Sequence, residues 1–341
     1  ARRFAPYKRP NLLLLDPERL ARILTDPKRP VQLILAGKAH PQDAGGQALI
    51  QRWNEFIRRA DLRGHVVFLA DYDMLLTQEL VQGVDVWVNT PRRPWEACGT
   101  SGMKVLVNGG LNLSELDGWW AEAYSPAVGW AIGDEQEHGD DPEWDRAEAE
   151  TLYTLLEREV VPAFYTRDDA GVPTGWVARM RASMASLTPM YSANRAVREY
   201  TNEHYVPAAA AFADRAADGG RLGTELVAWQ QALAAHWDQV RFGAVTIETR
   251  GAEHAFDVQV FLDELDPEFV RVELYADAAD GDHPFCEPAT RSRALEGSAG
   301  GYVYRATVPA TRAAAAYTPR IVPFRAGAAV PLEASQILWQ R

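Results

Sequence analysis

The residues with the clearest chemical potential lie between positions 96 and 104. The stretch reads Glu96-Ala-Cys-Gly-Thr-Ser-Gly-Met-Lys104 and leads into a segment with helical character. A Gly/Thr/Ser loop that opens a helix exposes backbone N–H groups at the positive end of the helix dipole, where a phosphate binds well. Lys104, one turn into the helix, is an amine that can form an imine with a carbonyl cofactor. Such loops also occur as plain turns, so spacing alone leaves both interpretations open.

A second group of charged residues opens the chain, in the order Ala1-Arg-Arg-Phe-Ala-Pro-Tyr-Lys-Arg9. Two adjacent phosphates require fixed cations, because their charges otherwise repel each other. A solvated basic segment or a nucleic-acid-binding arm would have the same composition. The formal net charge of -12 argues against a nucleic-acid-binding surface.

The elements that position these residues alternate between strand and helix over residues 1 to about 160. Strands are predicted at 31–36, 65–70 and 85–89, and helices at 17–24, 47–60, 75–83 and 142–161. Short apolar runs between helices imply a parallel sheet with crossovers on both faces, which is a doubly wound α/β lobe. Further helices are predicted at 174–187 and 224–240, with an Ala-, Asp- and Gly-rich linker or marginal helix at 208–223.

The last third of the chain has period-two alternation, which predicts a compact antiparallel β-sandwich. The expected strands are 245–249, 256–261, 270–275 and 302–308, with two more at 317–324 and 337–339 and a turn at 279–282. Four aromatic residues in this part could stack on sugars, but we expect a core role instead: Tyr275, Tyr302, Tyr304 and Trp339. Packing roles are also expected for Trp119, Trp120 and Trp130, and the acidic tract 134–145 is expected to be a solvated loop.

Several classes of protein are not indicated. No run approaches the ~20 apolar residues of a membrane span, and no signal peptide is recognisable. Cys98 and Cys286 lie far apart and suggest neither a disulfide framework nor a metal site, which fits a reducing cytoplasm. The chain does not begin with Met, and we expect it to be part of a longer polypeptide.

The 96–104 stretch resembles the cofactor-lysine signature of glycogen and maltodextrin phosphorylases, Glu-Ala-Ser-Gly-Thr-(Gly/Ser)-(Asn/Gly)-Met-Lys. The segment 108–118 is similar to the Asn-Gly…Leu-Asp-Gly of that family. The first nine residues resemble its phosphate-binding segment, (Val/Ala)-(Lys/Arg)-Arg-(Ile/Phe)-x-x-Tyr-Lys-Arg. The resemblance covers roughly residues 1–205, and the tail resembles only the longer-tailed bacterial branch of these enzymes.

The resemblance implies the C-terminal part of an α-glucan phosphorylase, a two-lobed glycosyltransferase. Residues 1–205 would form its Rossmann-like cofactor lobe, 206–240 a helical linker and 241–341 the β-sandwich. The implied reaction is reversible phosphorolysis of terminal α-1,4-linked glucose to glucose 1-phosphate. Pyridoxal 5′-phosphate would be the cofactor, with its phosphate group as proton relay to orthophosphate. Because the N-terminal lobe of the polypeptide would be missing, we expect the chain alone to be inactive.

The resemblance also implies roles for individual residues. Lys104, Thr100, Ser101 and Arg2 would hold the cofactor, Arg3 and Lys8 would bind orthophosphate, and Glu96, Cys98 and Gly99 would line the glucose subsite. Two positions depart from the family pattern. Cys98 replaces the usual Ser, and Val66, next to His65 and near Arg63, aligns with an Arg that contacts the cofactor phosphate.

Two other functions remain open at the level of sequence. A nucleotide-sugar-dependent glucan synthase would share the architecture, but it has no use for Lys104. A non-catalytic glucan-binding module could be built on the C-terminal sandwich alone.

Overall fold

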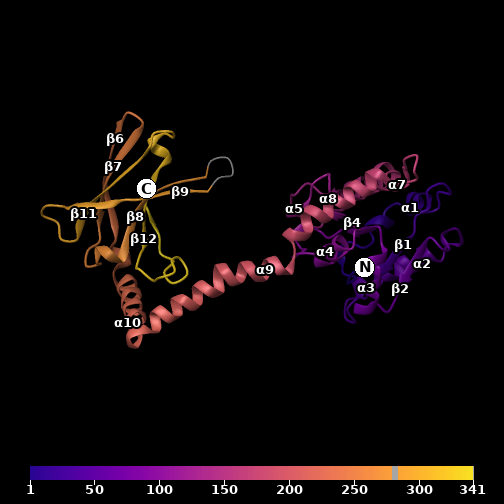
Figure 1. Cartoon of the computed structure of the whole chain (residues 1–341), viewed down its shortest axis with the longest axis horizontal. Coiled ribbons are helices and arrows are strands. Elements are labelled where there is room, and N and C mark those ends of the chain that lie inside the picture. Colours follow the sequence, from indigo (N-terminus) through magenta and orange to yellow (C-terminus); the bar gives the residue numbers. More distant parts are fainter. Residues whose placement is uncertain (279–282, 341) are drawn as a thin grey trace. The chain divides into compact units, whose positions relative to one another are not determined.

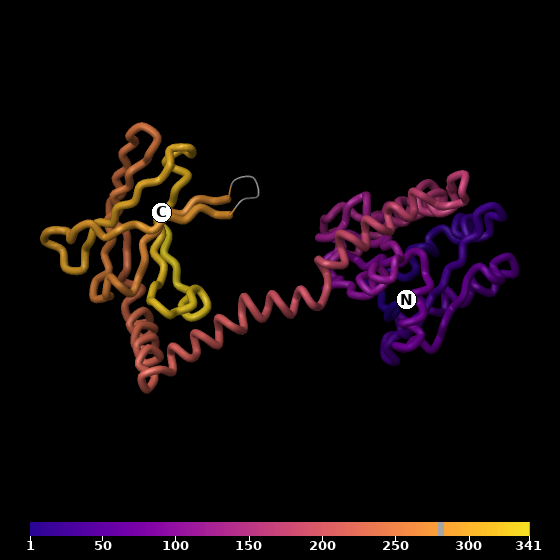
Figure 2. Tube along the Cα trace, in the orientation of Figure 1, coloured from indigo at the N-terminus to yellow at the C-terminus, as the bar shows by residue number. Residues whose placement is uncertain are grey.

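The computed structural model describes residues 1–278 and 283–340, and the turn predicted at 279–282 lies outside these residues. The chain divides into two compact units, Ala1–Arg198 and Glu199–Arg341 (Figures 1 and 2). The first unit is mixed α/β with parallel strands, and the second carries antiparallel sheets. The domain limits expected from sequence, at 205 and 240, remain predictions.

The strands of the first unit form two separate parallel sheets. Strand β1 (Leu33–Ala36) pairs with β2 (Val66–Leu69). A second sheet has the order β3 (Val86–Asn89), β4 (Leu111–Glu115), β5 (Gly129–Ile132). The three predicted strands and their parallel direction are confirmed. Strands β4 and β5 were not predicted. In β4, Asn112 and Ser114 interrupt the continuous apolar run expected of a buried parallel strand, and both are buried and hydrogen-bonded inside the protein.

Nine helices connect and follow these strands within the described residues: α1 (Pro17–Leu24), α2 (Ala44–Ile57), α3 (Met74–Gly83), α4 (Thr100–Val107), α5 (Trp119–Ala123), α6 (Pro142–Leu155), α7 (Val161–Tyr165), α8 (Thr174–Met190) and α9 (Ala193–Glu199). Aspartate side chains cap the amino ends of α1, α2, α3 and α6 by accepting from backbone N–H groups, which defines where these helices begin. A π-helical turn, Leu156–Val160, joins α6 to α7.

Tryptophan side chains fill much of the first unit's core. Trp53, Trp120 and Trp130 are fully or almost fully buried, and Trp119 is 5% exposed. The packing role expected for Trp119, Trp120 and Trp130 is therefore confirmed. The indole N–H of Trp120 donates to the carbonyl oxygen of Trp130 at 2.9 Å, so burial leaves that polar group satisfied.

The second unit opens with a π-helical segment, Tyr200–Tyr205, which leads into helix α10 (Val206–His236). The backbone of α10 is non-helical from Ala217 to Gly220. After this break, Leu226, Trp229 and Leu233 pack into the core of the unit. One antiparallel sheet has the order β10 (Thr290–Ala294), β11 (Gly301–Pro309), β7 (Glu253–Phe261), β6 (Arg241–Arg250). The other has the order β13 (Leu338–Trp339), β12 (Thr318–Pro323), β8 (Val270–Ala276), β9 (Phe285–Pro288). Both sheets contribute to one hydrophobic core, as in a sandwich.

The core role expected for four aromatic residues of this unit is only partly correct. Tyr304 is buried, and Tyr302 packs against the core. Tyr275 and Trp339 instead lie on the outer face of their sheet, with ring centroids 5.2 Å apart. Tyr275 alternates with Leu274 and Ala276, which point inward, so the pleat directs its ring away from the core.

No helix in the described parts of the chain combines the length and the apolar character needed to cross a membrane.

Substitutions at two neighbouring residues of α4 test which face of this helix is buried. Leu106 is 1% exposed and Val107 is 50% exposed. We expect Leu106→Ala to lower the free energy of unfolding by about 2–5 kcal/mol, because it leaves a cavity. Val107→Ala should change it by no more than about 0.5 kcal/mol. Urea denaturation of the whole chain measures both, and equal effects would show that α4 is wrongly oriented.

Candidate active site

The residues implicated by sequence converge on the carboxyl ends of the parallel strands. Loop 90–99 follows β3, and loop 116–118 follows β4. The opening segment of the chain reaches the same edge, because the Arg2 N–H donates to the Ala36 carbonyl at 2.9 Å and the Arg92 N–H donates to the Tyr7 carbonyl at 2.7 Å. This edge is where open α/β sheets bind their ligands.

Lys8 and Glu96 form the closest contact between two predicted site residues. Their Nζ and Oε2 atoms are 2.5 Å apart, although 88 positions separate them in the sequence. The two side chains are only 15% and 10% exposed, so the ion pair is shielded from most solvent. The structure thus brings Lys8, which is predicted to bind phosphate, into direct contact with Glu96, which is predicted to bind glucose.

Arg2 and Arg3 lie beside this pair in different environments. The Arg2 guanidinium donates to the Val88 carbonyl at 2.5 Å, at the end of β3. Desolvation lowers the pKa of Arg2 to about 10, while the charge of Glu96 opposes this change. Its Nη1 atom is buried and has no hydrogen-bond partner among the described residues. Arg3 is exposed and donates to the Tyr7 hydroxyl at 3.1 Å.

Helix α4 presents the remaining cofactor candidates. Gly99, with φ 92°, precedes its first residue, Thr100. Thr100 and Lys104 are both exposed and four residues apart, which places them on one face of the helix. Ser101 instead turns inward, and its Oγ accepts from the Trp87 indole N–H at 3.2 Å. Within residues 1–278 and 283–340, the Lys104 ammonium makes no hydrogen bond or ion pair.

The loop that contains Glu96 and Cys98 is hydrogen-bonded to the segment 117–119. The Glu96 N–H donates to Asp117 Oδ2 at 2.8 Å, and the Trp119 N–H donates to the Cys98 carbonyl at 2.9 Å. Gly118 has a φ of 54°, and a Cβ there would lie 2.4 Å from the Cys98 carbonyl oxygen, so only glycine fits. Burial, with the charges of Glu122 and Glu96, raises the pKa of the Cys98 thiol.

The main feature that sequence reasoning missed is a buried ion network around Arg9. Its guanidinium donates to the carbonyls of Thr90 (3.2 Å) and Pro91 (2.8 Å) and to three carboxylates: Glu115 (3.0 Å), Asp145 (2.8 Å) and Glu148. The side chains of Arg9, Glu115 and Glu148 are at most 5% exposed. No separate signal in the sequence marked this network, because its members lie far apart in the chain and Glu115 ends a strand that was not predicted.

The network contains more acids than one guanidinium can neutralise. Desolvation, and then a hydrogen bond to Glu148 and its negative charge, raise the pKa of Glu115. Glu148 and Asp145 outweigh the burial of Arg9 and raise the pKa of the guanidinium. Glu115 therefore holds a proton in the folded protein at a pH where it would be ionised in the unfolded chain.

One expectation about charge is corrected by these contacts, and the surroundings of Val66 can be described. The acidic tract 134–145 is not only a solvated loop, because Asp145 lies in α6 and binds Arg9 and Arg92. Val66 is 5% exposed within β2, so its side chain packs in the core. His65 and Arg63 precede β2 and so lie at the amino edge of the sheet, opposite the site. None of the three can supply a cation to the carboxyl edge.

Comparison with known proteins finds relatives for both units of the chain. Residues 1–129 match the carbohydrate phosphorylase family, and residues 237–341 match the glycogen phosphorylase C-terminal domain. The chain is 40% identical over 332 residues to a glycogen phosphorylase of Mycobacterium tuberculosis, covering 95% of this chain and 38% of the relative. It is 49% identical over 205 residues to a glycogen phosphorylase of Aquifex aeolicus, covering 60% of this chain and 29% of the relative.

A maltodextrin phosphorylase of Thermococcus litoralis is 40% identical over 276 residues, covering 81% of this chain and 32% of the relative. The chain thus belongs to the carbohydrate phosphorylase family and corresponds to the C-terminal part of its members. It spans less than two-fifths of the length of these relatives.

The proton held by Glu115 predicts how stability depends on pH. A carboxyl group whose pKa is raised on folding stabilises the protein most below its unfolded pKa, and this stability is lost as pH rises toward the folded value. Between about pH 5 and 8, the native chain should lose up to about 1.4 kcal/mol per pH unit relative to Glu115→Gln. The control Glu150→Gln, at a 65% exposed side chain, should follow the native curve. Parallel curves for the native chain and Glu115→Gln would contradict the assignment.

Proposed function

We propose that this chain is the cofactor-binding part of an α-glucan phosphorylase. The enzyme would transfer the terminal glucose of an α-1,4-glucan to orthophosphate, reversibly, and release glucose 1-phosphate. The observation that carries this proposal is the arrangement at the carboxyl edge of β3 and β4. There, Lys8 of one family motif and Glu96 of the other form an ion pair, and the exposed ammonium of Lys104 is carried by the helix that follows.

The residues present fit pyridoxal 5′-phosphate. Arg2 is a desolvated cation with one buried N–H group that lacks a partner among the described residues, so an anion would satisfy it. Lys104 offers an amine without an ion-pair partner in the same set of residues. The amino end of α4 leaves backbone N–H groups free of intrahelical bonds, as a phosphate requires. When bound, this cofactor would supply a phosphate group able to relay a proton.

In this proposal, the ε-amine of Lys104 would hold the cofactor and fix its position. Thr100 and the backbone of Ser101 would bind the cofactor phosphate, and Arg2 would neutralise it. The Ser101 hydroxyl already accepts from Trp87, so we assign binding at this residue to its N–H group. Gly99 precedes the helix with a φ of 92°, a backbone conformation that glycine adopts without strain.

Orthophosphate would bind at Arg3 and Lys8. Arg3 is exposed and free to reach an anion, whereas Lys8 is paired with Glu96 and would share its charge between that carboxylate and the phosphate. Fixed positive charge at this point stabilises a phosphate beside a developing oxocarbenium-like glucosyl group. Glu96, Cys98 and Gly99 would contact the glucose. The raised pKa of Cys98 keeps it a neutral thiol, a weaker hydrogen-bond donor than a Ser hydroxyl.

Residues 1–205 would act as the Rossmann-like lobe of a two-lobed enzyme, with the N-terminal lobe of the same polypeptide completing the cleft. Without that lobe, water screens the fixed charges, so we propose that the isolated chain is inactive. A cytoplasmic location and the absence of nucleic-acid or membrane partners complete the proposal. The glucan synthase and the glucan-binding module are less favoured, because the relatives matched over both units are named as phosphorylases.

The role of Lys104 is tested in a polypeptide that joins this chain to the N-terminal phosphorylase lobe. Borohydride reduction of the cofactor-saturated protein, followed by peptide mapping, should place the label on Lys104. Lys104→Ala should lose the label and the absorbance of bound cofactor, yet remain folded because the side chain is exposed. Lys38→Ala, at a lysine that is 60% exposed, should keep both. A label on Lys38, or no label, would overturn the assignment.

The role of Arg3 is tested in the same polypeptide by the kinetics of phosphate use. Arg3→Ala should lower kcat/KM for orthophosphate by about two orders of magnitude. This corresponds to a loss of transition-state stabilisation on the order of 3 kcal/mol, because one charge-assisted contact is lost. Arg63→Ala, which removes an exposed cation at the opposite edge of the sheet, should leave this value unchanged. Unchanged phosphate kinetics in Arg3→Ala would show that this segment does not bind the substrate.

A further inference from the structure

The sheet formed by β13, β12, β8 and β9 has a cluster of aromatic and charged side chains on its outer face. Trp339, Arg320 and Glu273 lie opposite one another on three adjacent strands, so they form one row across the sheet. Tyr275 lies two residues along β8 from Glu273 and is therefore on the same face. These four residues are called the outer-face cluster below. Strands β8 and β12, which contribute three of them, lie side by side in Figure 1.

The ionic groups of the cluster bind each other. Arg320 donates from Nε to Glu273 Oε2 at 2.9 Å, and its Nη2 atom lies 2.8 Å from the same oxygen. The Glu273 side chain is only 7% exposed although it is on the solvent side of the sheet, and it also binds Cys286 and Arg271. Within residues 1–278 and 283–340, Nη1 of Arg320 has no hydrogen-bond partner. The ion pair therefore fixes a guanidinium that still has N–H groups to donate.

Two aromatic rings enclose this guanidinium. Arg320 Cζ lies 4.7 Å from the ring centroid of Tyr275 and 5.4 Å from that of Trp339. The two ring centroids are 5.2 Å apart, and the ring planes are nearly perpendicular, at 79°. Trp339 remains 36% exposed, because it lies on a strand of two residues at the edge of the sheet. Each ring is thus held at a fixed angle, and the Trp339 indole offers part of its surface to solvent.

This combination of groups suits a sugar. The C–H hydrogens of a pyranose ring are weakly positive and pack on the negative face of an aromatic ring. Its hydroxyl oxygens can accept from a fixed guanidinium. The formal net charge of -12 disfavours a polyanion, and an apolar partner would desolvate the ion pair without giving it new hydrogen bonds. An uncharged ligand rich in hydroxyl groups therefore fits the outer-face cluster best.

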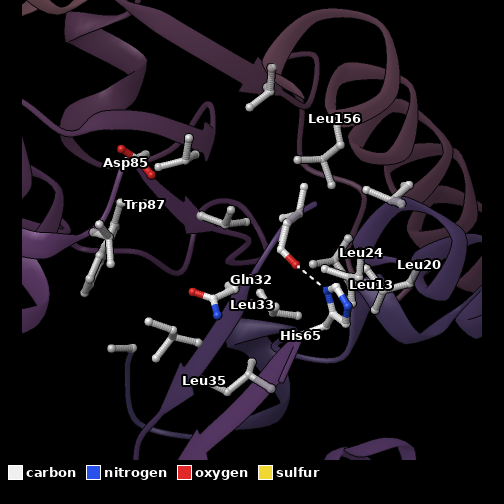
Figure 3. A pocket seen from close by; sticks show the side chains of 18 of the residues that line it. Leu13, Leu20, Leu24, Gln32, Leu33, Leu35, His65, Asp85, Trp87 and Leu156 are labelled. Carbon is white, nitrogen blue, oxygen red and sulfur yellow. Dashed lines mark hydrogen bonds between the residues drawn. The ribbon is translucent and has the colours of Figure 1, made fainter. Parts of the chain in front are cut away.

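The large cavity of the first unit differs from this cluster in its chemistry. It lies between β1 and β3, has a volume of about 600 Å³ and is lined mainly by apolar side chains. Figure 3 shows some of them: Leu20 and Leu24 from α1, and Leu33 and Leu35 from β1. Glucan hydroxyls buried against these side chains would lack hydrogen-bond partners, which costs free energy. The outer-face cluster is therefore better suited to a sugar chain than this cavity.

We propose that the outer-face cluster is an accessory binding site for the α-1,4-glucan on which the enzyme acts. Tyr275 and Trp339 stack on glucose residues of the polymer, and Arg320, oriented by Glu273, donates to their hydroxyl groups. The identity of the polymer rests on the proposed function, whereas the fit to a sugar rests on the geometry of the cluster. Binding one stretch of a long glucan here raises the effective concentration of its ends at the catalytic site. The site adds to the catalytic activity and does not replace it.

Oxidative footprinting of the whole chain tests the site without changing any residue. Hydroxyl radicals oxidise accessible aromatic side chains, and mass spectrometry measures the rate at each position. Glycogen should slow oxidation of Tyr275 and Trp339 by roughly tenfold, because a stacked sugar covers the rings. Phe212, which is 73% exposed in α10, is the internal control. Rates are expressed relative to Phe212, which corrects for radicals consumed by the polymer.

A set of variants measures the contribution of the indole ring to affinity. Trp339→Ala should weaken binding of the whole chain to glycogen by roughly tenfold in co-sedimentation, because a central aromatic contact is lost. Trp339→Phe keeps an aromatic ring and should retain most of the affinity. Phe212→Ala, which removes an exposed ring outside the cluster, should bind glycogen as the native chain does.

Three results would overturn the inference. The first is oxidation of Tyr275 and Trp339 at rates that glycogen does not change. The second is equal glycogen binding by Trp339→Ala and the native chain. The third is protection that appears on raising the protein concentration without glycogen, since this would assign the face to contact between copies of the chain. No readout needs cofactor, phosphate or the N-terminal lobe, so failure here is separate from failure of the labelling test at Lys104.

Discussion

The geometry of the candidate site depends on the buried guanidinium of Arg9. This single group binds the carbonyls that follow β3, the carboxylate at the end of β4 and two acids of α6. It therefore fixes the segment that contains Lys8 against the loop that contains Glu96. A planar fork with five donors can hold all of these partners at once, which a lysine cannot do.

The basic residues of the opening segment have two different roles. Arg9 stabilises the fold, whereas Arg2, Arg3 and Lys8 lie where an anion could bind. Arg9 is enclosed by acids, and the excess negative charge in its pocket is relieved by a proton on Glu115. Arg2, Arg3 and Lys8, which belong to the same segment, remain at the strand ends with unsatisfied or shareable N–H groups. An anion at this edge would therefore meet fixed cations whose positions are already determined by packing, and this preorganisation is what makes such charges effective.

The sequence predicted the parts of the molecule that follow local rules. Apolar runs located β1, β2 and β3, the helices predicted at 17–24 and 75–83 agree with α1 and α3, and two motifs indicated the candidate site. Strand β4 was missed because its polar residues bind partners inside the protein. The role of Arg9 and the outward position of Tyr275 depend on contacts between residues distant in sequence, or on which face of a sheet is buried. The cavity between β1 and β3 has no local signal at all, since it arises from two edges that lack a partner within the described residues.

The central claim, that Arg9 organises the carboxyl edge, is tested most directly by amide hydrogen exchange in Arg9→Lys. This variant keeps the positive charge but loses the fork. We predict faster exchange at the amides of Arg92, Glu96 and Trp119, which are hydrogen-bonded across the site, and no change in the strands of residues 241–340. The control is Arg19→Lys, because Arg19 also binds two acids, Glu150 and Glu157, but these are more exposed than the partners of Arg9. This variant should leave exchange at all of these amides unchanged. Native-like exchange at Arg92, Glu96 and Trp119 in Arg9→Lys would contradict this account.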